Sequence, residues 1–569
     1  MLRITSAQIN PTIGDIQGNI GLMANAARVA RDSGAQLVVF PEMSLTAYYP
    51  GDLLDDVEFQ ARIEAGLNEL KLATRETPSL CWVVGTPTCH PGVGKPFYNS
   101  LLVIQNGEIL LQYDKQLLPT YGVFDERRHF EPGADVARVL RIAGVQVGFM
   151  ICEDGWNDEG RDYNANPFQR LADAAPDLVV SVNASPSNIG KREQRHAIFS
   201  AACARHKLPL LYVNQVGGHD QLVYDGASFA VNATGVVAFE APSFCENTQT
   251  ISFDVELSEF LGGDELSGAP GARESLPTME FYRQQIVLGL KDYARRCGFT
   301  KAVVGCSGGI DSALTLALAV EALGAQNVVG ITMPSRFSSD GSVSDSEALC
   351  SNLGIELITH PIRDLVSAFE SSFSGAFGQE LKGLALENLQ ARVRGTTLME
   401  FSNSFGHLLL TTGNKSEVSV GYFTIYGDSN GGLGLISDLF KTEVFELCRH
   451  LNATAGRELI PLGIIDKPPS AELAPGQKDS DSLPPYEVLD EILKHLIEGD
   501  RMPAWERERC EAEMARLQSW TEGLAMIARV KKLIAKSEFK RRQTPPGVRV
   551  RGKAFGSGRQ VPVCAVQYA

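Results

Sequence analysis

Residues 301–324 read KAVVGCSGGIDSALTLALAVEALG, and this stretch decides the class of fold. A short apolar run, KAVV, is followed by a glycine-rich turn and then by a long apolar stretch that can form a helix. The apolar runs that predict further strands are NVVGITMPS (327–335), IELITHPI (355–362) and HLLLTTG (407–413). Strands that alternate with helices indicate an α/β layer architecture for this half of the chain.

The first half of the chain shows a similar alternation. Residues 19–34, NIGLMANAARVARDSG, have the spacing of a helix that ends at Gly34. Asn106 and Gly107 lie between SLLVIQ and EILLQY, and this dipeptide strongly indicates a two-residue hairpin. The runs that predict buried strands are AQLVVF (35–40), LCWVVG (80–85), VQVGFMI (145–151), DLVVSVNAS (177–185) and PLLYVNQV (209–216). We expect an α/β architecture here too, with part of the sheet antiparallel.

Composition and charge exclude several classes of protein. The chain has 569 residues, of which 44% are hydrophobic and 21% charged, as in soluble globular proteins. Its 52 Lys+Arg against 68 Asp+Glu give a net charge of −16, which disfavours a general nucleic-acid binder. No run approaches the roughly 18 apolar residues of a membrane span, and we see no leader, so we expect a cytoplasmic protein. The eleven cysteines are never spaced C-x-x-C, which argues against a disulfide framework or a structural zinc site.

A change in composition predicts the domain boundary. LGGDELSGAPGARESLPT, which begins at residue 261, is rich in Gly, Pro, Ser and acidic residues and has no periodicity, as expected of an exposed connector. We predict a first domain over 1–260, a connector over 261–285 and a second domain over 286–569. Residues 466–486 contain five prolines and predict a long ordered or lid-like loop.

Three chemically reactive side chains follow predicted strands of the first domain. Glu42 follows LVVF and a proline, Lys115 follows the second arm of the hairpin, and Cys152 follows VGFMI. Side chains from distant parts of a chain converge at strand ends, so the three can form one site. A thiolate can attack a carbonyl carbon, a carboxylate can take the thiol proton, and an ammonium can stabilise the oxyanion. Singly, each residue type at such a place is more often structural.

The segments around these residues resemble the nitrilase superfamily, in which a Glu-Lys-Cys triad hydrolyses carbon–nitrogen bonds. The resemblance rests on PEMSLTAY (41–48), YDKQLLPTYGVFDERRHFEPG (113–133) and ICEDGW (151–156). It implies a four-layer αββα sandwich. It also implies that Glu42 is a general base, that Lys115 stabilises the intermediate and that Cys152 is the nucleophile.

Within that superfamily, LPTYGVFDE and ICEDGW are most similar to the glutaminase domains of ammonia-transferring synthetases. The resemblance implies that Tyr121 lines a glutamine pocket. It also implies that Ser185 and Lys191, in NASPSNIGKR, contact the substrate. Glu126 is either a further member of the site or, with the charged residues beside it, part of a surface loop.

Residues 305–312, GCSGGIDS, join the predicted strand KAVV to the helix that follows it. Glycines let the backbone approach an anion closely, and a helix N-terminus adds free N–H groups and a positive dipole end. Ser307 and Ser312 add hydroxyl donors, so the segment predicts a phosphate cradle. It contains neither G-x-x-x-x-G-K-[ST] nor G-x-G-x-x-G, so it is not a Walker A loop or a dinucleotide fingerprint.

SGGIDS in this setting resembles the PP-loop of the adenine nucleotide alpha-hydrolase ATPases, which release AMP and pyrophosphate. The resemblance implies a Rossmann-like doubly wound sheet. Five further segments are similar to the NAD synthetase family: ENLQARVRGTTLM (387–399), TTGNKSEVSVGYFTIYGD (411–428), SDLFKTEVF (437–445), KPPSAELAPGQKDSDSLPPYEVLD (467–490) and EFKRRQTPPGVRV (538–550). With the first domain, they imply ATP-dependent amidation of deamido-NAD with ammonia from glutamine, and NAD as product rather than redox cofactor.

The resemblance also implies roles for individual residues of the second domain. The residues expected around ATP are Ser307, Gly308, Gly309, Asp311, Ser312 and Thr412. Those expected to contact deamido-NAD are Asn388, Glu417 and Lys540. Asp311 and Glu417 carry hard oxygen donors of the type that Mg²⁺ prefers, so we expect a magnesium cofactor there. Cys306, where the family commonly has Leu or Ser, is expected to be packed, because the loop works through its backbone.

Three alternatives stay open. Another glutamine-dependent PP-loop amidotransferase would act on a different carboxylate or nucleotide. The basic run at 540–542, with Arg549, Arg551 and Lys553 behind it, could bind RNA, but the net charge and the lack of interleaved aromatic residues disfavour this. The intact triad disfavours a sensor or interaction protein without catalysis. We expect small-molecule substrates, no nucleic acid or membrane, and a homo-oligomer.

Overall fold

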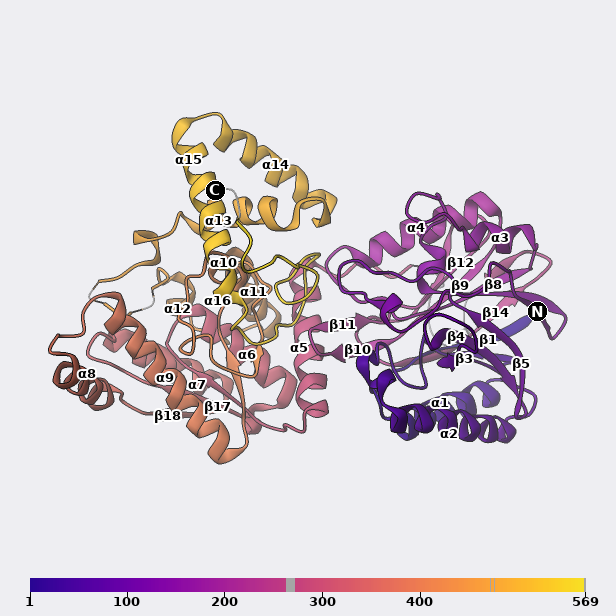
Figure 1. Ribbon diagram of the computed structural model, residues 1–569, viewed down its shortest axis with the longest axis horizontal. Helices are drawn as coiled ribbons and strands as arrows, with labels where there is room; N and C mark the ends of the chain where they lie inside the picture. Colours follow the sequence, from indigo (N-terminus) through magenta and orange to yellow (C-terminus); the bar gives the residue numbers. More distant parts are fainter. Residues whose placement is uncertain (262–271, 471, 475, 567–569) are drawn as a thin grey trace. The chain divides into compact units, whose positions relative to one another are not determined.

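The computed structural model describes residues 1–261, 272–470, 472–474 and 476–566 (Figure 1). The chain divides into two compact units. The first consists of Met1–Gly217 with Tyr224–Ser275, and the second consists of Gly218–Val223 with Leu276–Ala569. Within the described residues, no helix is both long and apolar enough to cross a bilayer.

The connector predicted over 261–285 is helical in its last part. Helix α5 (Thr278–Arg296) begins inside that range and buries Phe281, Tyr282 and Ile286. These side chains have helical spacing, so the helix starts before the expected end of the connector. Residues 262–271 lie outside the described residues, and the exact domain boundaries stay a prediction.

The first unit is built on two sheets with helices outside them. In Figure 1, α1 (Ile16–Asp32) and α2 (Val57–Ala73) lie on one side of the strands, and α3 (Pro167–Asp173) and α4 (Lys191–His206) lie on the other. The seven-stranded sheet has the order β15 (Glu259–Leu261), β14 (Asn247–Asp254), β1 (Leu2–Gln8), β2 (Leu37–Val39), β3 (Cys81–Cys89), β4 (Phe97–Gln105) and β5 (Glu108–Asp114). The six-stranded sheet has the order β13 (Val237–Glu240), β12 (Phe229–Val231), β9 (Leu210–Asn214), β8 (Leu178–Asn183), β7 (Val145–Ile151) and β6 (Val139–Ile142). The four-layer αββα sandwich implied by the resemblance is confirmed.

Strand β8 shows how the core of this unit forms. Leu178, Val180 and Val182 pack between the two sheets, whereas Val179 packs with side chains of α3 and α4 on the other face. Because both faces are covered, the strand is apolar throughout rather than alternating. It pairs in parallel with β7 and β9, so the carboxyl ends of these three strands meet at one edge.

The predicted hairpin and first helix are both present. Asn106 and Gly107 join β4 to β5, with φ angles of 48° and 86°. A type I′ turn needs positive φ at both central residues, which Asn-Gly adopts at low cost. Helix α1 ends at Asp32, and Gly34 follows with a φ of 70°.

The second unit contains one parallel sheet. Its order is β18 (Glu356–Thr359), β17 (Val328–Thr332), β16 (Ala302–Gly305), β19 (Leu408–Thr411) and β20 (Leu433–Gly434). The chain moves outward from β16 to β17 and β18, then returns to place β19 on the other side of β16. The order of strands therefore reverses between β16 and β19, which is where ligands bind in open α/β sheets.

Helices cover both faces of this sheet. Right-handed crossovers in opposite directions place helices on opposite faces. Helices α8 (Arg363–Phe377) and α9 (Leu384–Phe405) pack against Val303, Ile331 and Leu409, and α6 (Ile310–Leu323) contacts β16 and β17. The other helices of the sheet region are α7 (Asp340–Leu353), α10 (Lys415–Val420), α11 (Lys441–Ala455) and α12 (Leu462–Asp466). The doubly wound sheet is thus confirmed.

A helical cluster follows the sheet in sequence. Helices α13 (Tyr486–Leu493), α14 (Ala504–Gln518) and α15 (Thr521–Lys536) share a core that includes Leu489, Met514 and Val530, and α16 (Glu538–Arg541) comes after them. Between α12 and α13 lies the predicted loop of 466–486. Its described residues contain a single 3₁₀ turn, Asp479–Asp481.

Candidate active sites

The first site lies where strands of both sheets end. Glu42 follows β2 and Lys115 follows β5 of the seven-stranded sheet, whereas Cys152 follows β7 of the six-stranded sheet. All three side chains are buried. The structure brings them together: Lys115 forms an ion pair with Glu42, and both charges act on the Cys152 thiol.

Lys115 is the cation at the centre of this site. Its Nζ lies 2.8 Å from Oε1 of Glu42 and 2.6 Å from Oε1 of Glu126. Burial alone lowers the pKa of Lys115, but Glu126 and Glu42 outweigh burial and hold the pKa well above its usual value. A lysine in these surroundings stays an ammonium, which is the form that can stabilise an oxyanion.

Two further groups hold Glu42. Nδ2 of Asn99 donates to Oε1 of Glu42 at 2.7 Å, and the backbone N–H of Ala184 donates to Oε2 at 3.0 Å. Asn99 is on β4 and Ala184 follows β8, so the carboxylate is fixed from both sheets. A carboxylate held in this way keeps a fixed position instead of rotating freely.

Cys152 opens the short turn η4 (Cys152–Gly155) with a φ of 44°. Such a φ is uncommon outside glycine and stores backbone strain, a feature that clusters at functional sites. Burial raises the pKa of its thiol well above the usual value, Glu42 raises that pKa further, and Lys115 opposes them. The cysteine is therefore a thiol that needs a base before it can attack.

Glu126 belongs to the site rather than to a surface loop. It is fully buried in η3 (Glu126–Arg128), and its Oε1 accepts from the Tyr48 hydroxyl at 2.7 Å as well as from Lys115. Burial raises the pKa of Glu126 to about 7, against the opposing effect of Lys115 and with a further rise from Glu42. Of the two interpretations left open by the sequence, the structure supports the first.

Asp154 is a buried residue that sequence reasoning missed. Its Oδ1 accepts from the backbone N–H of Leu117 at 2.8 Å and of Gln116 at 3.0 Å, directly after Lys115. Its Oδ2 accepts from the Tyr113 hydroxyl at 2.8 Å and from the Ile151 N–H at 3.2 Å. One carboxylate thus ties the segment after Lys115 to the turn that carries Cys152. An acid two residues after the cysteine, in ICEDGW, was the only signal for this in the sequence.

The three residues expected to contact glutamine lie in two places. The Tyr121 hydroxyl donates to both carboxylate oxygens of Glu153 at 3.0 Å, and the Lys191 ammonium lies 3.7 Å from the centre of the Trp156 ring. Both therefore reach the segment that follows Cys152. Ser185 is buried after β8, and its backbone N–H donates to Oδ1 of Asn214 at 2.9 Å.

Glu153 is a second acid that sequence reasoning missed. It accepts from the hydroxyl of Tyr163 at 2.9 Å in addition to that of Tyr121. Burial raises the pKa of this carboxyl, and Lys115 opposes the rise. An acceptor beside the cysteine suits a ligand that carries an ammonium group, which a free amino acid does.

The second site is a cavity of about 270 Å³ in the second unit. It lies at the carboxyl ends of β16 and β19, where the order of strands reverses. The residues expected around ATP that line it are Ser307, Gly309, Asp311, Ser312 and Thr412, and Glu417 lines it too. The structure thus brings these six together.

The loop 306–309 has the features of an anion cradle. Gly308 has a φ of 73°, and a Cβ there would come within 2.4 Å of the backbone oxygen of Ser342. Only glycine fits both conditions. The hydroxyl of Ser307 accepts from the Gly309 N–H at 3.2 Å and lies 3.2 Å from the hydroxyl of Ser312. The loop leads directly into the N-terminus of α6, where free N–H groups favour an anion.

Asp311 and Glu417 share one cation. Nζ of Lys441 lies 2.5 Å from Oδ2 of Asp311 and 3.2 Å from Oε1 of Glu417. Nδ2 of Asn414 donates to the other oxygen of Asp311 at 2.9 Å. Burial raises the pKa of Glu417 to about 8, with Lys441 opposing and Asp311 adding to the rise. Lys441 and Asn414 were missed from the sequence, although both lie in segments that carry the family resemblance.

Asn388 and Lys540 both contact the segment 421–424 and do not line the described cavity. Oδ1 of Asn388 accepts from the Thr424 hydroxyl at 2.7 Å. Nζ of Lys540 donates to the carbonyls of Gly421 at 2.9 Å and of Phe423 at 2.8 Å. Both residues therefore hold the segment 421–424, in which Tyr422 lines the cavity.

Several other residues singled out from the sequence are internal. Arg551 is fully buried, lies 2.7 Å from Oε1 of Glu498, and also pairs with Glu443 and Glu506. Arg541 is buried and donates to the carbonyl of Ser419 at 2.7 Å. Basic groups bound inside the protein do not form a surface for RNA. Cys306 is packed as expected, beside Cys350.

Comparison with known proteins identifies the family. The carbon-nitrogen hydrolase model matches residues 3–260, and the NAD synthase model matches residues 282–544. The chain is 45% identical over 571 residues to a glutamine-dependent NAD(+) synthetase of Synechocystis, covering 99% of this chain and 98% of the relative. It is 38% identical over 589 residues to that of Thermotoga maritima, with the same coverage. The chain belongs to the glutamine-dependent NAD(+) synthetase family.

Solved structures of this family agree with the fold. The chain matches the glutamine-dependent NAD+ synthetase of Acinetobacter baumannii, solved with ADP, at 34% identity and a TM-score of 0.76, covering 99% of this chain and 98% of that one. The synthetase of Cytophaga hutchinsonii matches at a TM-score of 0.80 and 20% identity, with the same coverage. Because its sequence identity is only 20%, the match to the Cytophaga hutchinsonii structure supports the fold alone. The family expected from the residues is therefore confirmed over essentially the whole chain.

Proposed function

We propose that the chain makes NAD by amidating deamido-NAD, with ATP as the activating substrate and glutamine as the source of ammonia. The observation that carries the proposal is the presence of two complete constellations in one chain. One is a buried Cys152 with Glu42, Lys115 and Glu126. The other is a glycine-loop cavity with two acids. The products are then NAD, glutamate, AMP and pyrophosphate.

At the first site, Cys152 attacks the side-chain amide of glutamine. Glu42 takes the thiol proton, which the raised pKa of Cys152 makes necessary. Lys115 donates a hydrogen bond to the oxyanion of the tetrahedral intermediate. Glu42 gives that proton to the nitrogen of the intermediate, whose collapse forms a thioester and releases ammonia. Water then attacks the thioester while Glu42 takes a proton from it, and Glu42 returns this proton to the Cys152 sulfur as glutamate leaves.

We further propose that Tyr121, Ser185 and Lys191 form the glutamine pocket. The placement of Tyr121 and Lys191 against the segment that follows Cys152 supports this. Glu153, which accepts from Tyr121, is suited to the α-ammonium of glutamine.

At the second site, a carboxylate oxygen of deamido-NAD attacks the α-phosphate of ATP, and pyrophosphate leaves. The loop of Ser307, Gly308 and Gly309, with Ser312, binds the phosphates, and Thr412 lies beside the nucleotide. Ammonia then attacks the acyl-adenylate and displaces AMP. Only neutral ammonia has the lone pair that this step needs. Asn388 and Lys540 support the substrate side through the segment 421–424.

Asp311 and Glu417 fit a magnesium ion. They are two carboxylates around a single ammonium, that of Lys441, and Glu417 takes up a proton readily in their shared surroundings. The two groups have oxygen donors, and a divalent ion would supply the positive charge that keeps both carboxylates ionised, which suits Mg²⁺. When bound, the ion offsets charge on the phosphates.

The experiment that tests this function follows the nitrogen atom. The chain is incubated with ATP, Mg²⁺, deamido-NAD and glutamine labelled at its side-chain amide, and the products are separated by mass spectrometry. We expect label in NAD, with AMP, pyrophosphate and glutamate in equal amounts. AMP formation with other acids but not with deamido-NAD would favour another PP-loop amidotransferase, and no turnover at all would favour a sensor.

The proposal also covers the cellular location and the oligomeric state of the chain. We propose that the chain works in the cytoplasm, where its ATP and dinucleotide substrates are available. We also propose that it forms a homo-oligomer, which sedimentation of the purified chain would test.

A further inference from the structure

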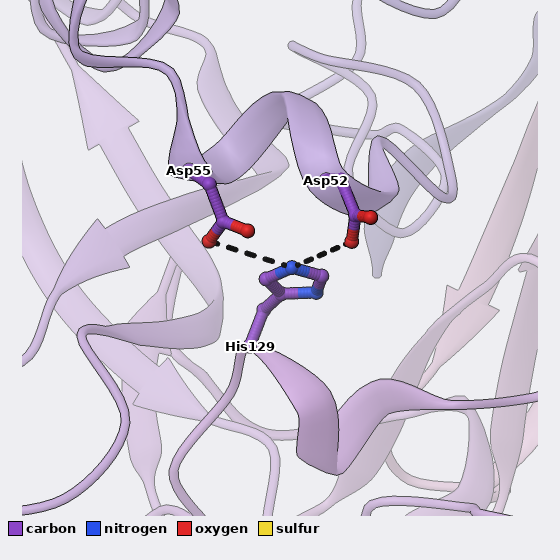
Figure 2. Close-up of side chains that lie close together, drawn as sticks. All are labelled: Asp52, Asp55 and His129. Atoms are coloured by element: carbon purple, nitrogen blue, oxygen red, sulfur yellow. Dashed lines mark ion pairs between the residues drawn. The ribbon is translucent and has the colours of Figure 1, made fainter.

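Asp52, Asp55 and His129 lie together in the first unit, and none of them has a part in the proposed reaction. Figure 2 shows both carboxylates directed at one ring nitrogen of His129. Asp52 and Asp55 come from the 3₁₀ turn η1 (Gly51–Asp55), and His129 follows η3. Nε2 of His129 lies 3.2 Å from Oδ1 of Asp52 and 3.6 Å from Oδ1 of Asp55.

His129 is buried, with only 2% of its surface exposed. Its Nε2 has no hydrogen-bond partner among the described residues, although it points at the two carboxylates. Its other nitrogen, Nδ1, lies 2.5 Å from the hydroxyl of Tyr49. That hydroxyl donates to the backbone carbonyl of Asp125 at 3.2 Å.

These contacts allow a tautomer of the ring that suits a metal ion. When the Tyr49 hydroxyl gives its proton to the carbonyl of Asp125, the oxygen of Tyr49 can accept from Nδ1 of His129. Nε2 of that tautomer carries a lone pair, which is aimed at two carboxylates. Lone pair and anions repel one another unless a cation lies between them. The same arrangement, in which the second ring nitrogen donates to a neighbour, is how metal-binding histidines are oriented.

We propose that Asp52, Asp55 and His129 bind a divalent transition-metal ion of the zinc class. One imidazole nitrogen and two carboxylate oxygens suit such an ion, with water in the remaining position. Ligands about 2.1 Å from a tetrahedral metal are about 3.4 Å apart, and the two distances from Nε2 lie on either side of that value. All three ligand atoms lie within 4.8 Å of one another.

Solvent can reach the proposed metal site from one side, and one basic side chain competes with the ion for a ligand. The side chains of Asp52 and Asp55 are 63% and 66% exposed, so an ion can enter from solvent on their side. Arg128 competes for both oxygens of Asp52, because its Nε lies 2.8 Å from Oδ1 and its Nη2 donates to Oδ2 at 2.9 Å. The Arg128 side chain is 54% exposed, so it can turn away into solvent when an ion binds. In the described part of the chain, Asp55 has His129 as its one ion-pair partner.

A bound ion would join the two turns, η1 and η3. Tyr48, which precedes η1, donates to Glu126, which begins η3. The ion would therefore brace the backbone beside the triad without touching the reacting atoms. The proposal does not depend on the proposed function, because it concerns binding alone.

The test is a measurement of metal binding to the full chain, with cobalt(II) as the probe. Metal-free protein is kept in excess Mg²⁺ to fill oxygen-only sites and is then titrated with Co²⁺. Bound metal is counted by equilibrium dialysis, and the visible spectrum distinguishes nitrogen and oxygen ligands from thiolates. Variants are His129→Gln, Asp55→Asn and Tyr49→Phe. Matched controls are Glu64→Gln and His360→Gln, whose side chains are exposed.

We expect the wild type and both controls to bind one equivalent more than His129→Gln and Asp55→Asn. Tyr49→Phe should keep the site but weaken it about 10- to 100-fold. Removal of Arg128 by Arg128→Gln should tighten it. Equal stoichiometry and equal spectra in wild type, His129→Gln and Asp55→Asn would overturn the proposal and leave a histidine–carboxylate ion pair. Because Asp55 is exposed, its variant tests the site even if His129→Gln does not fold.

Discussion

The ammonium of Lys115 lies 2.6 Å from Oε1 of Glu126, nearer than the 2.8 Å that separates it from Oε1 of Glu42. One buried cation therefore serves two carboxylates. Glu126→Gln keeps the shape of that side chain but removes its charge from Lys115. We expect glutamine hydrolysis to fall by about 10²-fold, because Lys115 loses one of the two carboxylates that position it. Synthesis of NAD from ammonium chloride should not change.

Glutamate release and NAD formation measure the two activities separately. Glu64→Gln, on the exposed face of α2, is the control and should behave as wild type. A Glu126→Gln variant that hydrolyses glutamine normally would show that Lys115 needs only Glu42.

Glu126 also predicts a dependence of stability on pH. Burial, against the effect of Lys115, raises its pKa from 4.5 to about 7. Between these values the folded chain keeps a proton that the unfolded chain has released. The contribution of Glu126 to stability therefore falls as pH rises through this window. The Glu126→Gln variant has no such proton. The melting temperature of the variant minus that of the wild type should therefore increase as the pH rises from about 4.5 to about 7. A difference that stays constant with pH would contradict this.

Local patterns predicted much of the fold. The apolar run of β8 indicated a strand because its side chains are buried on both faces, and Asn106-Gly107 indicated a turn because of its backbone preference alone. The triad could be placed as well, since each member lies within three residues of the end of a strand. In each case the information lies within a few neighbouring residues.

The supporting residues could not be found in this way. Asn99 is 57 positions from Glu42, and Lys441 is 130 positions from Asp311. Such contacts exist only once the strands and helices have packed, and nothing near either residue in the sequence marks its partner. For the same reason, the sequence could not show that Asn388 and Lys540 contact the segment 421–424 and do not line the cavity.

The two proposed sites predict different dependence on the nitrogen source for two substitutions. Cys152→Ala removes the nucleophile, so glutamine-driven synthesis should fall by more than about 10³-fold while ammonium-driven synthesis persists. Asp311→Asn weakens a ligand of the proposed magnesium ion, so synthesis should fall with either nitrogen source. Both are measured as NAD formed from glutamine or from ammonium. Normal use of glutamine by Cys152→Ala would refute the assigned nucleophile.

Asp154 predicts a loss of both stability and hydrolysis. It accepts four hydrogen bonds, two of them from the segment directly after Lys115. Asp154→Asn replaces one accepting oxygen by a donor that faces other donors, which costs about 1–3 kcal/mol. Thermal unfolding and glutamate release should both show the loss. Asp177→Asn, which also breaks a bond from a backbone N–H but near the surface, should have a smaller effect.

Gly308 tests the phosphate cradle. Gly308→Ala would place a Cβ 2.4 Å from the Ser342 carbonyl oxygen at a φ of 73°, so the loop must shift. A shifted loop no longer presents its N–H groups to the phosphates, and we expect KM for ATP to rise about tenfold or more with either nitrogen source. Gly375→Ala is the matched control: Gly375 is in the last turn of α8, a Cβ there would meet nothing within 4 Å, and the change should stabilise the chain by at most about 0.5–1 kcal/mol. Steady-state kinetics in ATP and thermal unfolding separate the two effects. An unchanged KM for Gly308→Ala would mean that the phosphates bind elsewhere in the cavity.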